Sequence, residues 1–265
     1  MSIPVIFIHN GNQDYFKTVF QQACKLNAYV FVLGDRVKTP LAHFYTDHYF
    51  ELAGEFAKHY EHLSTNGYEV ELMCFQRWFI LQDFMVKHGM DRCFHLDSDT
   101  MLYANVDEEY PKYEQFDFTL SHRCCGNGCF FTLKGLSEFC NFLINFYRNK
   151  STYEYERVTA HYHIRQKHGL DGGVCDMTLL EFYSYKHCGK IGEMMHILDG
   201  SVYDHNINET DQYFNMSPKG IKDIFFVNGK PFCGQKILGQ DIQFKTLHFQ
   251  GSAKRFIPEF VHAGC

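Results

Sequence analysis

Residues 94–101 read FHLDSDTM, an apolar run that ends at two carboxylates separated by one serine. The run is typical of a buried strand, so Asp97 and Asp99 would meet where two like charges are poorly solvated. A cation could neutralise the pair, because Mg²⁺ and Mn²⁺ prefer oxygen ligands and often bind through one or two carboxylates. The alternative is an ordinary solvated turn with an Asx cap. The stretch therefore predicts either a divalent-ion site or a turn.

The segments around this stretch predict alternating strands and helices. Residues 3–9 and 28–35 are β-branched and aromatic runs, and the segment between them has apolar residues at helical spacing, with Asp14 placed to cap a helix. A long apolar helix that stops at Gly89 precedes the strand at 92–96. The further elements expected are helices at 49–63, 69–89, 135–149 and 175–188, and strands at 116–121, 129–134, 223–227 and 244–249.

Nearly continuous apolar strands are typical of a sheet that helices cover on both faces. Strand, helix and strand at these lengths indicate a parallel α/β sheet. Ligands of such sheets bind at the carboxyl ends of the strands. Asn10, Asp35 and Asp97 follow three of the predicted strands, so we expect them at that edge of the sheet.

The composition indicates one compact unit. The chain has 265 residues, 45% of them hydrophobic and 17% aromatic, which is enough to bury one large core. The sequence contains no Gly/Ser/Pro-rich linker and no repeat, and only six prolines. We expect a single domain over residues 1–265. The net charge of −6 argues against a nucleic-acid partner, because nucleic-acid binders normally carry a basic excess.

The N-terminus and the cysteines predict a cytoplasmic protein. The start, MSIPVIFIHNGNQDYF, has no basic segment before its short apolar run, and no run approaches the ~18 apolar residues of a membrane span. Eleven cysteines, several within apolar patterns, are expected to be reduced thiols. Cys124, Cys125 and Cys129 form CCGNGC, but no second pair follows at zinc-finger spacing. We expect no signal peptide, membrane span or structural zinc.

A second candidate stretch lies near the other end, where residues 246–256 read TLHFQGSAKRF. His248 ends a predicted strand, Gly251 permits a close approach of the backbone, and Lys254 follows. An imidazole can complete a Mn²⁺ shell, and an ammonium can bind a diphosphate that the ion also binds. The alternative is a half-buried histidine followed by a surface loop. Because the aspartate pair predicts the same ion, the two stretches together favour a metal site.

RCFHLDSDTML with the downstream HFQGSAKRF resembles GT-A glycosyltransferases, which use nucleotide sugars. The layout is similar to the glycogenin and lipopolysaccharide galactosyltransferase group, which has an Arg in the helix before the metal strand, a D-x-D motif and a late H-x-x-G-x-x-K. The opening IPVIFIHNGNQDYF resembles bacterial and viral sugar transferases. The residues that match the group's motifs in order are Arg77, Asp97, Asp99, His248, Gly251 and Lys254.

This resemblance implies a GT-A (Rossmann-like) fold, a mixed, mostly parallel sheet flanked by helices. It implies that Asp99 and His248 hold Mn²⁺ or Mg²⁺, with Asp97 sharing the ion or contacting the ribose. Lys254 and the backbone at Gly251 would hold the β-phosphate of the donor.

Other residues acquire roles from the same resemblance. Arg77 would face the donor sugar or diphosphate; the alternative is an arginine that reaches from an apolar helix to an internal carboxylate. Asn10 and Asp35 would lie near the base and ribose. Asp176 would be a general base in an inverting enzyme or a polar stabiliser in a retaining one, or simply a helix N-cap. In CCGNGC, Gly126 stands where relatives have a sugar-contacting Asn.

The function implied is transfer of a hexose from a nucleotide-diphosphate sugar to a hydroxyl of a glycan or another acceptor, in glycan synthesis. UDP is the expected nucleotide, with GDP as the alternative. A sugar-nucleotide nucleotidyltransferase is a second possibility, although HNGNQDYF lacks the basic, Gly-rich loop of that class. The third is a non-catalytic carbohydrate-binding protein in which Asp97 and Asp99 are structural.

Overall fold

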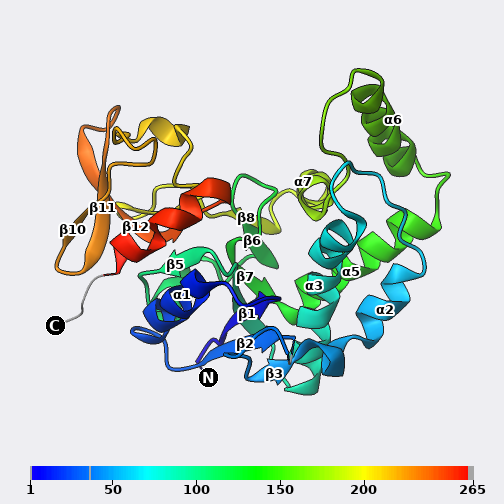
Figure 1. Ribbon diagram of the computed structural model, residues 1–265, viewed down its shortest axis with the longest axis horizontal. Coiled ribbons are helices and arrows are strands. Elements are labelled where there is room, and N and C mark those ends of the chain that lie inside the picture. Colours follow the sequence, from blue (N-terminus) through cyan, green and yellow to red (C-terminus); the bar gives the residue numbers. More distant parts are fainter. Residues whose placement is uncertain (1, 36, 262–265) are drawn as a thin grey trace.

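The computed structural model describes residues 2–35 and 37–261. Its larger sheet has seven strands in the order β3-β2-β1-β4-β7-β6-β8 (Figure 1). These strands are β1 (Val5–His9), β2 (Val30–Gly34), β3 (Phe44–Tyr45), β4 (Arg92–Leu96), β6 (Phe118–Leu120), β7 (Gly128–Thr132) and β8 (Ile191–Glu193).

The centre of the larger sheet is parallel. Strand β1 lies between β2 and β4 and runs parallel to both. Val5, Ile6 and Phe7 of β1 are fully buried, as expected for a strand that is covered on both faces. Strand β7 is antiparallel to β4 and to β6, which makes the sheet mixed. The mixed, mostly parallel α/β sheet predicted from the sequence is confirmed.

A smaller sheet brings the two candidate stretches together. It contains β10, β11, β12 and β5 in that order, and β9 also pairs with β12. Strand β12 runs antiparallel to β5, with His248 opposite Thr100. Because β5 directly follows Asp99, this pairing sets the end of β12 beside the aspartates. The strands are β5 (Thr100–Leu102), β9 (Ser201–Tyr203), β10 (Phe225–Val227), β11 (Lys230–Gln235) and β12 (Gln240–His248).

Helices lie on both sides of the larger sheet. Figure 1 shows α1 and the C-terminal 3₁₀ segment η4 on one side and α2, α3 and α5 on the other. Helix α3 packs against α2, α5 and α7, so it is apolar around most of its circumference. The helical segments are α1 (Asp14–Cys24), η1 (Thr46–Tyr49), α2 (Glu51–Ala57), α3 (Tyr68–Lys87), α4 (Val106–Glu109), η2 (Tyr110–Lys112), α5 (Leu133–Arg148), α6 (Tyr153–Lys167), α7 (Asp176–Lys186), η3 (Asp211–Tyr213) and η4 (Gly251–Phe260).

Some local predictions were wrong. Asp14 does not cap α1, because the N-cap is Gln13 and Asp14 is the first helical residue. At that position its negative charge interacts favourably with the positive end of the helix dipole. The helix expected at 49–63 is confined to the shorter α2. Helix α6 was missed because it buries only Tyr155 and Val158, which leaves little apolar periodicity to read.

The cysteines within the described residues are free thiols, as expected. Burial raises the pKa of Cys74 and of Cys124 to about 12, so both stay protonated and poorly nucleophilic at neutral pH. Within residues 2–35 and 37–261, no helix combines the length and apolar character needed to cross a membrane.

Candidate active site and metal site

Asp97, Asp99 and His248 form the one cluster of potential metal ligands among the described residues, and we call it the Asp–Asp–His triad. Each offers one ligand atom, and these atoms all lie within 4.8 Å of one another. The aspartates follow β4 and His248 ends β12, so the β5–β12 pairing determines their proximity. Two carboxylate oxygens and one imidazole nitrogen suit Mn²⁺, and the carboxylates also suit Mg²⁺. The triad therefore fits the divalent ion that the sequence predicted.

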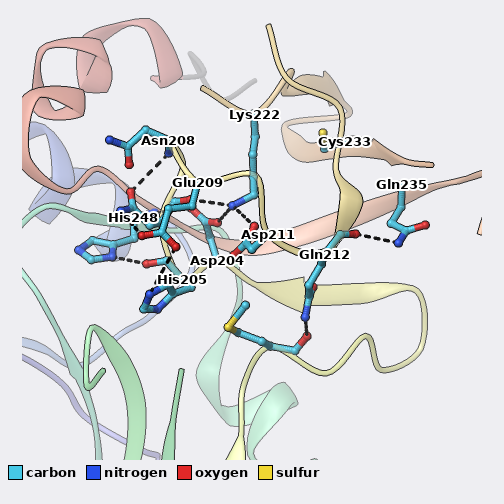
Figure 2. A network of polar contacts seen from close by, with 12 residues as sticks. Asp204, His205, Asn208, Glu209, Asp211, Gln212, Lys222, Cys233, Gln235 and His248 are labelled. Carbon is cyan, nitrogen blue, oxygen red and sulfur yellow. Dashed lines mark hydrogen bonds and ion pairs between the residues drawn. The ribbon is translucent and has the colours of Figure 1, made fainter. Parts of the chain in front are cut away.

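The ring of His248 is oriented by a neighbouring backbone carbonyl. Its Nδ1 lies 2.5 Å from the carbonyl oxygen of His205, to which it donates a hydrogen (Figure 2). Nε2 then faces Asp99 Oδ1 at 3.5 Å. Histidines that bind metals commonly donate their other nitrogen in this way, which fixes the tautomer. Burial opposes a charge on His248, but the nearby carboxylate of Asp99 outweighs it and raises the pKa of the imidazole.

Lys254 lies beside the triad. Its Nζ is 2.8 Å from Asp99 Oδ2, and the pair is partly exposed. Burial lowers the pKa of Lys254, but the hydrogen bond and charge of Asp99 outweigh this effect and leave the pKa raised. Gly251, at the start of η4, has φ +59°, a conformation that side chains other than glycine rarely adopt. In the H-x-x-G-x-x-K motif, His248 thus ends a strand, Gly251 forms a left-handed turn, and Lys254 reaches Asp99.

Arg77 connects the triad to Asp176. One guanidinium nitrogen donates to Asp97 Oδ1 at 2.8 Å and the other to Asp176 Oδ2 at 2.7 Å. Burial disfavours the charge of Asp97, but Arg77 and the neighbouring His95, whose Nε2 lies 3.4 Å from Oδ1, outweigh burial and hold its pKa well below the usual range. The arginine therefore binds two internal carboxylates and lies at the candidate site as well, so the two interpretations of Arg77 are compatible.

Asp176 does not occupy the N-cap position of α7, contrary to one interpretation of the sequence. Cys175 is the N-cap and forms a capping box with Thr178, and Asp176 is the first helical residue. Its Oδ2 also accepts a hydrogen bond from Trp78 Nε1 at 3.1 Å, and the guanidinium of Arg77 lies over the Trp78 ring. The carboxylate therefore bridges the first turn of α7, where Oδ1 accepts from Met177 N, and the two donors from α3.

Asn10 and Asp35 follow β1 and β2 at the predicted edge of the sheet, but within the described segments no hydrogen bond or ion pair joins them to the triad. Asp35 Oδ1 accepts from the backbone N–H groups of Lys38 and Val37, which hold the pKa of its carboxyl below the usual range.

A cavity of about 310 Å³ opens close by, lined by neighbours of these two residues rather than by Asn10 or Asp35 themselves. His9 and Thr39 are among its lining residues, and no sequence motif pointed to either of them.

Two residues of the CCGNGC turn pack against groups that adjoin the site. A Cβ on Gly126 would lie 2.5 Å from Cη2 of the buried Trp78, so this position has no room for a side chain. Asn127 is buried. Its backbone carbonyl accepts from Asp97 N at 2.9 Å, and its side-chain Nδ2 donates to the backbone carbonyl of Asp204 at 3.1 Å. Asn127 therefore supports the position of Asp97, a role that no local sequence pattern indicates.

No family model and no curated protein matches the sequence. Similar solved structures include mouse xyloside xylosyltransferase 1 (9% identity, TM-score 0.47, 76% of this chain and 88% of that chain) and the galactosyltransferase LgtC (9%, 0.45, 97% and 95%). The bifunctional glycosyltransferase WbbM is 13% identical with a TM-score of 0.50, over 98% of this chain and 49% of WbbM. At this identity the likeness concerns the fold alone, and the chain has the GT-A glycosyltransferase fold that its sequence predicts.

Proposed function

We propose that the chain is a metal-dependent glycosyltransferase that moves a hexose from a UDP-sugar to a hydroxyl of a glycan or a similar acceptor. The observation that carries the proposal is the convergence of the Asp–Asp–His triad with Lys254, from segments about 150 positions apart in the sequence. A pair of structural aspartates in a binding protein would need neither the imidazole nor the ammonium. The GT-A fold supports the same reaction class.

In this proposal the triad holds Mn²⁺ or Mg²⁺, which when bound supplies Lewis-acid stabilisation of the diphosphate leaving group. The chain itself contributes Lys254, whose ammonium lies at the triad and would bind the β-phosphate, together with the backbone at Gly251. Fixed positive charge at the place where negative charge develops is typically the largest catalytic contribution in such reactions. Asn10 and Asp35, beside the cavity at the ends of β1 and β2, are proposed to lie near the ribose and base.

We propose that Asp176 stabilises the reacting sugar electrostatically instead of acting as a general base. Both of its carboxylate oxygens already accept hydrogen bonds: Oδ1 from Met177 N, and Oδ2 from Arg77 and Trp78. A base needs an accessible oxygen lone pair directed at the proton that it takes, and this carboxylate is 4% exposed. This arrangement is the one that the resemblance associates with retaining transfer.

The first test is thermal unfolding with UDP, with and without Mn²⁺. With metal present and UDP supplied at 100 times its Kd, binding raises the free energy of unfolding by about 2.7 kcal/mol. That increase raises Tm by about 5–10 °C for a chain of this size. We expect this shift with UDP and Mn²⁺ together and its loss with a chelator. A UDP shift of equal size without metal would contradict the proposal. Slow hydrolysis across a panel of nucleotide sugars would then identify the donor.

Lys254→Ala is expected to weaken use of the donor. The loss of one charge-assisted hydrogen bond, worth about 1.5–3 kcal/mol, corresponds to about 10- to 100-fold in kcat/KM for the nucleotide sugar. The adjacent Arg255→Ala is the matched control, because Arg255 is exposed and lies over Phe256. Kinetics of Lys254→Ala equal to those of the control would remove Lys254 from the diphosphate contact.

A further inference from the structure

Lys222 is a buried lysine in a polar network that extends to His248 of the triad (Figure 2). Its side chain is 1% exposed, and its Nζ lies 2.8 Å from Asp204 Oδ1 and 2.7 Å from Asp211 Oδ1. It also donates to the carbonyl oxygen of Asn206 at 2.7 Å. Burial opposes the charge of Lys222, but the two carboxylates outweigh this effect and raise its pKa. The ammonium is therefore held charged in the interior.

The segment 204–207 makes three hydrogen bonds with His248. Asp204 Oδ2 accepts from the backbone N–H of His248 at 3.0 Å, and the carbonyl of His205 accepts from the ring Nδ1 at 2.5 Å. Ile207 N–H donates to the carbonyl of His248 at 2.9 Å. The position and the ring orientation of this triad member are thus set by one short segment.

Lys222 in turn holds that segment at three points. Its ammonium binds the Asp204 carboxylate and the Asn206 carbonyl, and its backbone N–H donates to the Ile207 carbonyl at 2.7 Å. Buried ion pairs contribute little net stability, because removing the charges from water costs about as much as their attraction returns. A lysine buried at this point is better explained by the geometry that it imposes.

We propose that Lys222 is a positioning residue: through the segment 204–207 it holds the His248 imidazole so that Nε2 faces the two aspartates and can bind a divalent cation. The cation itself rests on the function proposed above. The positioning is a property of the chain alone, so it can be tested in the absence of any metal.

The metal-free test follows the ring N–H of His248 by NMR in ¹⁵N-labelled protein. In the wild-type chain we expect a slowly exchanging Nδ1–H signal, because that proton is bonded to the His205 carbonyl. Lys222→Met is expected to lose the signal through fast exchange. The control is Lys245→Met, which also breaks a largely buried ion pair, with Glu109 at 2.8 Å, on the strand that carries His248. An unchanged signal in Lys222→Met would overturn the inference.

A correctly oriented His248 should bind Mn²⁺ more tightly, and the Mn²⁺ affinity tests this consequence. EPR gives the affinity from the concentration of free Mn²⁺ in a titration. Supporting groups around metal ligands typically change affinity about 10- to 100-fold, and we expect a loss of that size in Lys222→Met but not in Lys245→Met. In a His248→Ala background, Lys222→Met should have no further effect, because its partner ligand is gone. An equal loss in both backgrounds would overturn the inference.

Lys222→Met leaves Asp204 as an unpaired buried charge, which could prevent folding. The variant Lys222→Met with Asp204→Asn removes that charge; Asp211 is 14% exposed and can be hydrated. We expect this double variant to unfold cooperatively and still to lose the His248 signal and the Mn²⁺ affinity. A folded double variant with wild-type values for both would overturn the inference. Absence of Mn²⁺ binding by the wild-type chain would instead overturn the metal site, while the NMR result decides the positioning.

Discussion

Asp99→Ala is expected to abolish Mn²⁺-dependent turnover of the nucleotide sugar while the chain stays folded. Asp99 contacts both other parts of the site: one oxygen faces His248 Nε2 at 3.5 Å and the other lies 2.8 Å from Lys254 Nζ. Its removal deletes one of three ligands and the partner of the ammonium. We expect a loss of about 10³-fold or more in kcat/KM, equivalent to about 4 kcal/mol, the scale of a metal's contribution to such a transition state.

The fold should survive this substitution because the groups left behind have other options. Lys254 is 35% exposed and can be hydrated, and His248 can become neutral while keeping its bond to His205. The matched control is Asp91→Ala, an exposed aspartate at the opposite end of β4, which should keep wild-type activity. Turnover, Mn²⁺ binding and Tm are measured for both. Wild-type turnover in Asp99→Ala would refute the assigned site.

The central strands could be predicted because burial on both faces imposes an apolar run. Val5–His9, Val30–Gly34 and Arg92–Leu96 each satisfy this pattern, and the structure pairs them as parallel neighbours. Strands β5 and β9 have three residues each, too few to show a period, and both were missed. The pairing of His248 with Thr100 is a long-range contact, which no local pattern specifies. Ligand chemistry and the motif resemblance predicted only that the two stretches meet around one ion.

The motif residues of the candidate site could be predicted from the sequence. The buried residues that hold them in place could not. Lysine is rarely buried, so no sequence pattern indicated that Lys222 lies in the interior. Asp176 was open to interpretation as an N-cap because aspartate is a common cap. The structure places Cys175 at that position, and the Asp176 carboxylate accepts from Arg77 and Trp78 of α3 instead of capping. These contacts depend on which helices pack together, and a short stretch of sequence does not show that packing.

Asp176→Ala is expected to lower both stability and activity, because this carboxylate is the shared acceptor of two buried donors. Its side chain is 4% exposed, and its Oδ2 accepts from Arg77 at 2.7 Å and from Trp78 at 3.1 Å. Removing one partner of a buried ion pair typically lowers the free energy of unfolding by about 3–5 kcal/mol. Because Arg77 still has Asp97 as a partner, we expect a loss of about 3 kcal/mol. That loss lowers Tm by about 6–12 °C for a chain of this size.

Two further variants separate the structural role of Asp176 from its proposed role in the reaction. Trp78→Phe removes one hydrogen bond to the carboxylate and part of a fully buried ring, so it should cost about 2–4 kcal/mol, with little change in kcat. Asp176→Asn keeps the shape and an acceptor oxygen but not the charge, so it should recover much of the stability while kcat stays about 10²-fold or more below the wild-type value. If the charge serves the reacting sugar, stability and kcat therefore separate in Asp176→Asn. If kcat instead recovers together with Tm, Asp176 supports only the packing of α3 against α7, and electrostatic stabilisation must come from another group.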